Sequence, residues 1–161
     1  MSTHLSPEEA ARSHRWHAVE CNNLAWELAN AAARTPAQDE EMLHAAHASA
    51  FHWAIAGTEL HNARARMLLA KVHAALGHAE MALAYSRQSS DYILSHEPPD
   101  WEVAFAHAVL AHAAFAADDT ALHYSEYVAA QQLGKAIADP EDRDVFLRSF
   151  AAIPRPSSLG A

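Results

Sequence analysis

The sequence predicts an all-α fold in which antiparallel helix pairs stack side by side, with about seven helices in one domain over residues 1–161. The first supporting observation is composition, because the chain is rich in alanine, a strong helix former, and has only 4 Gly and 7 Pro. The second is a helix-start signal that recurs along the chain. The third is a partial repeat, ALAYS at 82–86 and ALHYS at 121–125, whose period is typical of stacked helical units.

Charge and cysteine content exclude several classes of protein. The net charge of −9 and the pI of about 5.7 disfavour nucleic-acid binding through a basic surface. The single cysteine, Cys21, excludes an intrachain disulfide and a cysteine-based zinc cluster. The start, MSTHLSPEE, lacks the apolar core of a secretory signal, and the longest apolar stretch, 103–117, is too short to span a bilayer. We therefore expect a soluble, cytoplasmic protein that binds neither nucleic acid nor membranes.

The first two helices are predicted from their start signals. The segments SPEE (6–9) and TPAQ (35–38) both place a capping hydroxyl before Pro and an acid or amide three residues later. We expect helices over 6–33 and 37–56, with a break at Gly57. A single Gly can also lie inside a helix, so one long helix from 37 to 76 is an alternative.

The next two helices meet at a glycine turn. Leu69, Val72 and Leu76 share one helix face, and Gly77 follows as a residue that accepts the left-handed conformation at a helix end. The apolar spacing then restarts at Ala82. We expect helices over 58–76 and 79–96.

Prolines and aspartates mark the remaining boundaries. The pair Pro98-Pro99 cannot continue a helix, and aspartates before 120 and 140 can cap the two helices that follow. We expect helices over 100–117 and 120–137, and a short seventh helix that starts at Asp139. This last helix would cover the open end of the stack with Val145, Phe146, Phe150 and Ile153. Residues 1–5 and 154–161 are expected to be flexible.

The partial repeat lies in the fourth and sixth predicted helices. The segment ALAYS (82–86) returns as ALHYS (121–125), and the same offset aligns His73 with His112. This match predicts that His73 and His112 hold equivalent places late in the third and fifth helices. Packing against the paired helix is the simplest role for both histidines, and also for Tyr85 and Tyr124.

These motifs give the chain a resemblance to the tetratricopeptide repeat family over about residues 58–137. The family's Leu followed by a small residue, its turn Gly, and its Ala with a nearby aromatic correspond to Leu69, Ala70, Gly77, Ala82 and Tyr85. The second copy departs from the pattern, because Ala116 stands where the family has Gly. The resemblance implies a right-handed superhelix of helix pairs and, by analogy, a protein-binding role.

An inner groove is expected where the third and fifth helices face the inside of such a stack. Its candidate residues are Arg64, Met67, Leu68 and Lys71 from one helix and Val103, His107 and Leu110 from the other. The family's carboxylate clamp is not reproduced, since Leu110 stands at the second copy's equivalent of Lys71. We expect the groove to bind a protein or peptide of unknown identity, and self-association into a homodimer is an alternative.

The 13 histidines suggest a second interpretation. Glu41 and His44 have the Glu-x-x-His spacing of di-iron bundles, but a second copy of the motif is absent from the sequence. A mononuclear metal site, or a small-molecule site, could instead draw on residues from the first two helices, namely His14, His17, Glu41, His44 and His47. Solvated histidines on exposed helix faces are the competing explanation.

No short motif points to catalysis. Gly-rich phosphate loops and nucleophile elbows are absent from the sequence, and nothing near Cys21 marks it as a reactive thiol. The four tryptophans are expected in the core or at helix junctions. The sequence thus predicts a non-enzymatic interaction module without a cofactor, and leaves open an enzyme whose site no motif reveals.

Overall fold

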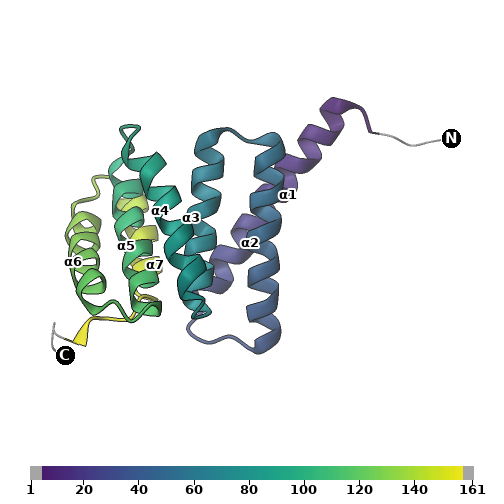
Figure 1. Cartoon of the computed structure of the whole chain (residues 1–161). Coiled ribbons are helices and arrows are strands. Elements are labelled where there is room, and N and C mark those ends of the chain that lie inside the picture. The colour runs from purple at the N-terminus through teal and green to yellow at the C-terminus, as the bar shows by residue number, and fades with distance from the viewer. Residues whose placement is uncertain (1–4, 158–161) are drawn as a thin grey trace.

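A computed structural model describes residues 5–157, and it contains seven α-helices and no strand within that range (Figure 1). The all-α prediction is therefore confirmed, and the break at Gly57 separates the second helix from the third. The first helix ends at Asn30, three residues earlier than expected. The helices are α1 (Pro7–Asn30), α2 (Pro36–Ala56), α3 (Glu59–Ala75), α4 (Ala79–Leu94), α5 (Asp100–Ala116), α6 (Thr120–Ala136) and α7 (Pro140–Phe150).

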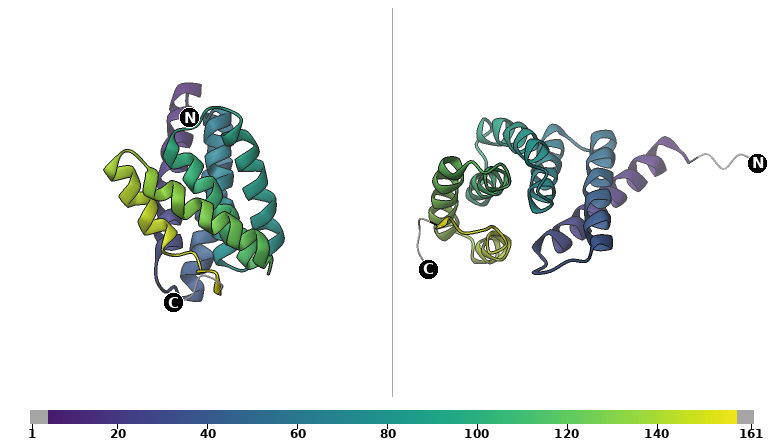
Figure 2. Two further views of the ribbon diagram at one scale, coloured as in Figure 1. Left: turned by 90° about the vertical axis from the view of Figure 1, so that its left-hand side faces the viewer. Right: turned by 60° about the horizontal axis from the view of Figure 1, so that its bottom comes forward.

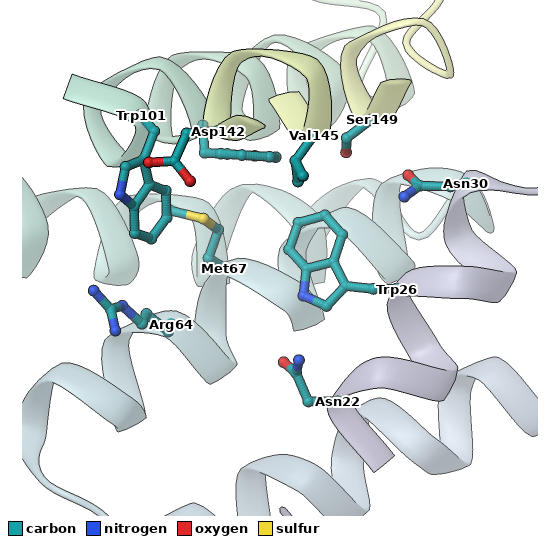
Figure 3. Close-up of a pocket in the computed structure, with 10 residues that line it drawn as sticks. Asn22, Trp26, Asn30, Arg64, Met67, Trp101, Asp142, Val145 and Ser149 are labelled. Atoms are coloured by element: carbon teal, nitrogen blue, oxygen red, sulfur yellow. The ribbon is translucent and has the colours of Figure 1, made fainter. Parts of the chain in front are cut away.

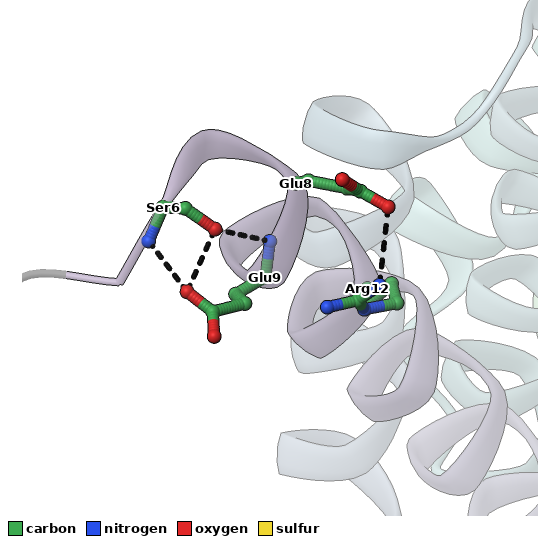
Figure 4. A network of polar contacts seen from close by, with 4 residues as sticks. All are labelled: Ser6, Glu8, Glu9 and Arg12. Carbon is green, nitrogen blue, oxygen red and sulfur yellow. Dashed lines mark hydrogen bonds and ion pairs between the residues drawn. The ribbon is translucent and has the colours of Figure 1, made fainter.

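The start signals in the sequence form the expected caps. At α1 the Ser6 hydroxyl accepts a hydrogen bond from the Glu9 backbone at 3.3 Å, and the Glu9 carboxylate accepts one from the Ser6 backbone at 2.8 Å (Figure 4). Hydrogen bonds from the Ser6 side chain and backbone lower the pKa of the Glu9 carboxyl. Thr35 and Gln38 repeat the arrangement at α2, and Asp139 caps α7. Each cap satisfies amides that a helix start leaves without intrahelical partners.

The helices pack as three antiparallel pairs followed by a single helix. α1 packs on α2, α3 on α4, and α5 on α6, while α1, α3 and α5 also contact one another in sequence order and α7 packs on α5 and α6. Figure 2 shows that this arrangement curls, so that α7 comes round to the side where α1 lies. The inner face of the molecule is therefore formed by α1, α3, α5 and α7.

Aromatic side chains hold α7 against the third pair. The Phe146 ring is fully buried and meets the edge of Phe105 at a centroid distance of 5.1 Å, and Phe150 stacks on Phe146 at 5.4 Å. Phe146, Phe150 and Ile153 cover this end of the stack as expected. Val145 does not, because its side chain is 50% exposed on the inner face.

The turns of the α3–α4 and α5–α6 pairs give a different alignment of the two pairs than the sequence match between ALAYS and ALHYS. Gly77 has φ of 74°, and its structural counterpart is Asp118, with φ of 55°. In both turns the amide that follows this residue donates to the carbonyl five residues earlier, from His78 to His73 and from Asp119 to Ala114. The letter match between ALAYS and ALHYS would instead align Gly77 with residue 116. The repeated letters are thus out of structural register by two positions.

This shift corrects the expectation for His112 and Tyr124. A shift of two positions turns a side chain about 200° around a helix, which moves it to another face. The counterpart of His73 is therefore Ala114, and Lys71 is the residue that corresponds to His112. Tyr124 is 41% exposed and does not pack as expected, whereas the neighbouring His123 is buried.

The two turns give a matched pair of stability predictions. Gly77→Ala is expected to lower the free energy of unfolding by about 1 kcal/mol, because an alanine at positive φ is strained even though its Cβ would meet no atom within 4 Å. Asp118→Gly is expected to raise it by about 0.5 kcal/mol by relieving the same strain. Urea unfolding of both variants measures this, and a neutral Gly77→Ala would contradict it.

The chain's last described residues are attached to the fold. His123 Nε2 lies 2.9 Å from the Pro154 carbonyl oxygen, and Pro156 is buried. Residues 154–157, part of the tail expected to be flexible, thus contact α6, while residues 1–4 and 158–161 lie outside the described range. Within residues 5–157, no helix combines the length and the apolar character needed to cross a bilayer.

Candidate functional site

A half-open groove of about 380 Å³ lies on the inner face, and we call it the inner groove. All four inner helices contribute to it, and Figure 3 shows α7 along one wall with the α1 residue Trp26 facing it. The lining residues are Asn22, Trp26 and Asn30 from α1, Arg64 and Met67 from α3, Trp101 and Phe105 from α5, and Asp142, Val145 and Ser149 from α7.

The floor of the inner groove is aromatic. The Trp26 and Trp101 rings both meet Phe105 edge to face, with centroid distances of 5.6 Å and 6.2 Å. The Arg64 guanidinium lies 5.3 Å from the Trp101 ring centre, and its Nε donates to the Glu102 carboxylate at 2.6 Å. Because Glu102 is fully buried, this ion pair fixes the Arg64 side chain beside the groove. The result is a rigid apolar surface with a cation at one edge.

A buried lysine lies behind the α7 wall. Lys71 Nζ donates to Ser149 Oγ at 2.9 Å and lies 5.2 Å from the Trp26 ring centre. Its side chain contacts no carboxylate in the described part of the chain. Burial, together with the positive charge of Arg34, lowers the pKa of Lys71 to about 7. Lys71 therefore exchanges its proton near neutral pH, unlike an ordinary lysine.

The structure brings part of the expected groove together. Arg64 and Met67 line the inner groove, whereas Lys71 and Leu68 are buried behind it. The three residues expected from the fifth helix, Val103, His107 and Leu110, do not line it. His107 instead contacts Glu126 of α6, with Nδ1 2.6 Å from the carboxylate.

The predicted α5 residues miss the groove because the sequence repeat was aligned in the wrong register. The match between ALAYS and ALHYS aligns Arg64 with Val103, and the other two predicted α5 residues follow from the same alignment. The turns align Gly77 with Asp118, so the α5 counterpart of Arg64 is Phe105, which does line the groove.

The alternative metal ligands separate into three places. His14 and His17 lie against His52 of α2, with 2.7 Å between the Nδ1 atoms of His14 and His52. His47 contacts His73. The remaining two, Glu41 and His44, line a shallow outer hollow with Cys21. Among residues 5–157, no three His, Cys, Asp or Glu side chains are grouped so as to hold a metal ion.

Two buried histidines have unusual protonation behaviour. Burial lowers the pKa of His112 to about 4, and the nearby charges of Lys71, His123 and Arg34 contribute. Burial also lowers the pKa of His73 to about 4, with His47 and His78 contributing. Both side chains are therefore neutral at pH 7.

Sequence reasoning missed the contributions of α1 and α7 to the inner groove. Asn22, Trp26 and Asn30 each lie one helical turn apart, so they form one stripe on α1, and this spacing was the available signal. For α7 no such signal existed, because Ser149 and Val145 reach the groove only through the curl of the whole stack.

No protein-family model, curated protein or solved structure matches this chain. The function is therefore inferred from the geometry and chemistry of the inner groove.

Proposed function

We propose that the chain is a TPR-like, non-catalytic interaction module whose inner groove binds an apolar side chain of a partner peptide. The observation that carries this proposal is the aromatic floor of Trp26, Trp101 and Phe105, which is open to solvent on one side. The groove's volume of about 380 Å³ suits one bulky side chain or a short segment. Three antiparallel helix pairs with matched turns at Gly77 and Asp118 support the TPR-like part of the proposal.

Polar groups at the rim suit an extended peptide. The Asn22 and Asn30 side chains each carry both a donor and an acceptor, the combination that a peptide backbone can pair with. Asn30 makes no hydrogen bond through its side chain among residues 5–157, so its amide is available to a ligand. Asp142 adds a carboxylate on the α7 side of the groove, which would attract a basic residue of the peptide.

The proposal is tested by selecting peptides and then blocking the groove. Random peptides displayed on phage are selected on the full chain, and their affinities are measured against Val145→Trp and Leu147→Trp. Val145 lines the groove, whereas Leu147 is on the same helix, is 41% exposed and lies outside it. We expect Val145→Trp to weaken binding by about tenfold or more, since the indole fills the groove. Leu147→Trp should bind like the wild type.

Two results would overturn the interaction role of this groove. One is the absence of any enriched peptide after selection. The other is a set of peptides whose affinity is the same for the wild type and for Val145→Trp.

One observation favours a second function, that of a serine hydrolase. Ser149 Oγ lies 2.9 Å from Lys71 Nζ, and a lysine with a pKa of about 7 can take the proton of a serine nucleophile. A fluorophosphonate probe decides between the functions, because attack by Ser149 Oγ on phosphorus displaces fluoride while Lys71 takes the proton. Labelling of Ser149 that disappears in Lys71→Met supports the hydrolase, and an unlabelled protein excludes it.

A further inference from the structure

A second hollow, of about 710 Å³, lies where α1, α3, α5 and α7 all end, and we call it the basic pocket. Its cationic or titratable members are Arg34 from the α1–α2 loop, His112 from α5 and Arg148 from α7. Asn30 lines both this pocket and the inner groove, so the two hollows adjoin. Figure 2 shows the α1 and α7 ends on the same side of the molecule.

The charge of the basic pocket is opposite to that of the chain. The chain carries a net charge of −9, yet no acidic residue of the described range lines this hollow. Arg34 is paired with Asp39, with 2.6 Å between Nε and Oδ1. Arg148 is exposed and forms no hydrogen bond or ion pair among residues 5–157. At least one guanidinium, that of Arg148, therefore faces the hollow without a balancing anion among residues 5–157.

A buried imidazole nitrogen also remains without a partner at the wall of the basic pocket. His112 is 7% exposed, and its Nδ1 has no hydrogen-bond partner among the described residues. Buried polar atoms without a partner are rare in folded proteins, and each calls for an explanation such as a bound ion or ligand. Lys71 and Arg34 lie close enough to His112 for their positive charges to add to the effect of burial in lowering its pKa.

The helix ends at the basic pocket carry partial negative charge, which opposes the binding of an anion. They are paired with only some of the cationic side chains of the pocket. Four helix C-termini bring partial negative charge to the hollow. Arg34 partly compensates one of them, the α1 C-terminus, because its Nη1 donates to the Leu28 carbonyl oxygen at 3.2 Å. No comparable bond in the described structure uses Arg148 or His112 Nδ1, so both remain for a ligand.

We propose that the basic pocket binds the oxyanion of a small molecule, with Arg148 and His112 Nδ1 as its donors. A guanidinium presents paired N–H groups that match the oxygens of a phosphate or a carboxylate. The volume of about 710 Å³ leaves room for an organic group attached to that oxyanion. Val145 does not line the basic pocket, so the Val145→Trp variant that blocks the inner groove leaves this pocket unfilled.

The experiment titrates the full chain with inorganic phosphate and, separately, with citrate by calorimetry, against sodium chloride of equal ionic strength. Arg148→Gln removes the unpaired guanidinium, and Arg87→Gln is the control, since Arg87 is exposed on α4 and makes the same change of charge outside the pocket. We expect saturable binding with a Kd of about 1 mM or lower for at least one probe. Arg148→Gln should weaken it by about tenfold and Arg87→Gln should not.

The pattern of binding also identifies the chemistry. Saturation by phosphate alone assigns the pocket to a phosphate ester, and saturation by citrate alone assigns it to a carboxylate. If neither probe saturates, or if Arg148→Gln and Arg87→Gln bind equally, then the proposal is wrong. His112→Asn gives a second check. If His112 contacts the oxyanion directly, then this variant should also bind the probe more weakly than the wild type.

Discussion

Replacing Gly134 by alanine is expected to lower the free energy of unfolding by about 3 kcal/mol, although alanine is the better helix former. A Cβ at residue 134 would overlap Cε1 of the Phe146 ring. The Phe146 ring cannot move aside easily, because it is fully buried between Phe105 and Phe150. The added methyl group must therefore push α7 away from α6.

A double-mutant cycle separates this clash from helix propensity. Phe146→Ala alone should cost about 4 kcal/mol through the cavity that it leaves. In the double variant the clash is gone, so Gly134→Ala should then cost almost nothing more. Gln132→Ala, an exposed change on the same helix, should stay within about 0.5 kcal/mol of the wild type. A Gly134→Ala protein as stable as the wild type would show that α7 does not rest on Gly134.

The second large effect has the opposite sign, since Lys71→Met is expected to raise the free energy of unfolding at pH 7 by about 2 kcal/mol. Lys71 is buried, its amine donates to Ser149, and it contacts no carboxylate among residues 5–157. Methionine has a similar length and can fill the same space without a charge.

The dependence on pH gives this prediction a specific signature. The folded pKa of Lys71, about 7, lies below its ordinary value of 10.5, so the unfolded chain holds the proton more tightly. Wild-type stability should therefore rise as pH increases from 7 towards 10, and Lys71→Met should lack that part of the rise. Lys135 is the only other lysine, and Lys135→Met is the control that should keep it. Equal pH profiles for wild type and Lys71→Met would refute the assigned pKa shift.

If Lys71 lowers the stability of the fold, as expected above, then its presence suggests a functional role. Groups held at a cost in stability are concentrated at binding and catalytic sites. Lys71 lies between the inner groove, through Ser149, and the basic pocket, through its electrostatic effect on His112. We therefore expect ligands of either hollow to change the protonation of Lys71.

Local signals in the sequence predicted the helices well. The caps at Ser6, Thr35 and Asp139 and the turn at Gly77 depend on a few neighbouring residues, which is why they could be recognised. The boundary at Asp118 and Asp119 was also predicted, but the left-handed conformation of Asp118 was not, because no pattern in the neighbouring residues marks it.

The groove was harder to predict because it depends on helical phase. The letter match between ALAYS and ALHYS chose the wrong face of α5, and Asp118 could be identified as the counterpart of Gly77 only once the turns were known. Trp26 and Ser149 belong to helices that the repeat did not cover. Trp26 and Ser149 line the same groove because the whole stack curls, and no local sequence pattern predicts that curl.

The position of α7 has a consequence for how the molecule would respond to a ligand. In an open stack each helix pair is stabilised only by its neighbours, so fluctuations at the first pair are not felt at the last helix. A ligand that touched Trp26 on α1 and Val145 on α7 would join the two ends and turn the open stack into a closed ring. The first and last helices would then open together instead of separately, and ligand release would be limited by the detachment of whichever end is more weakly held.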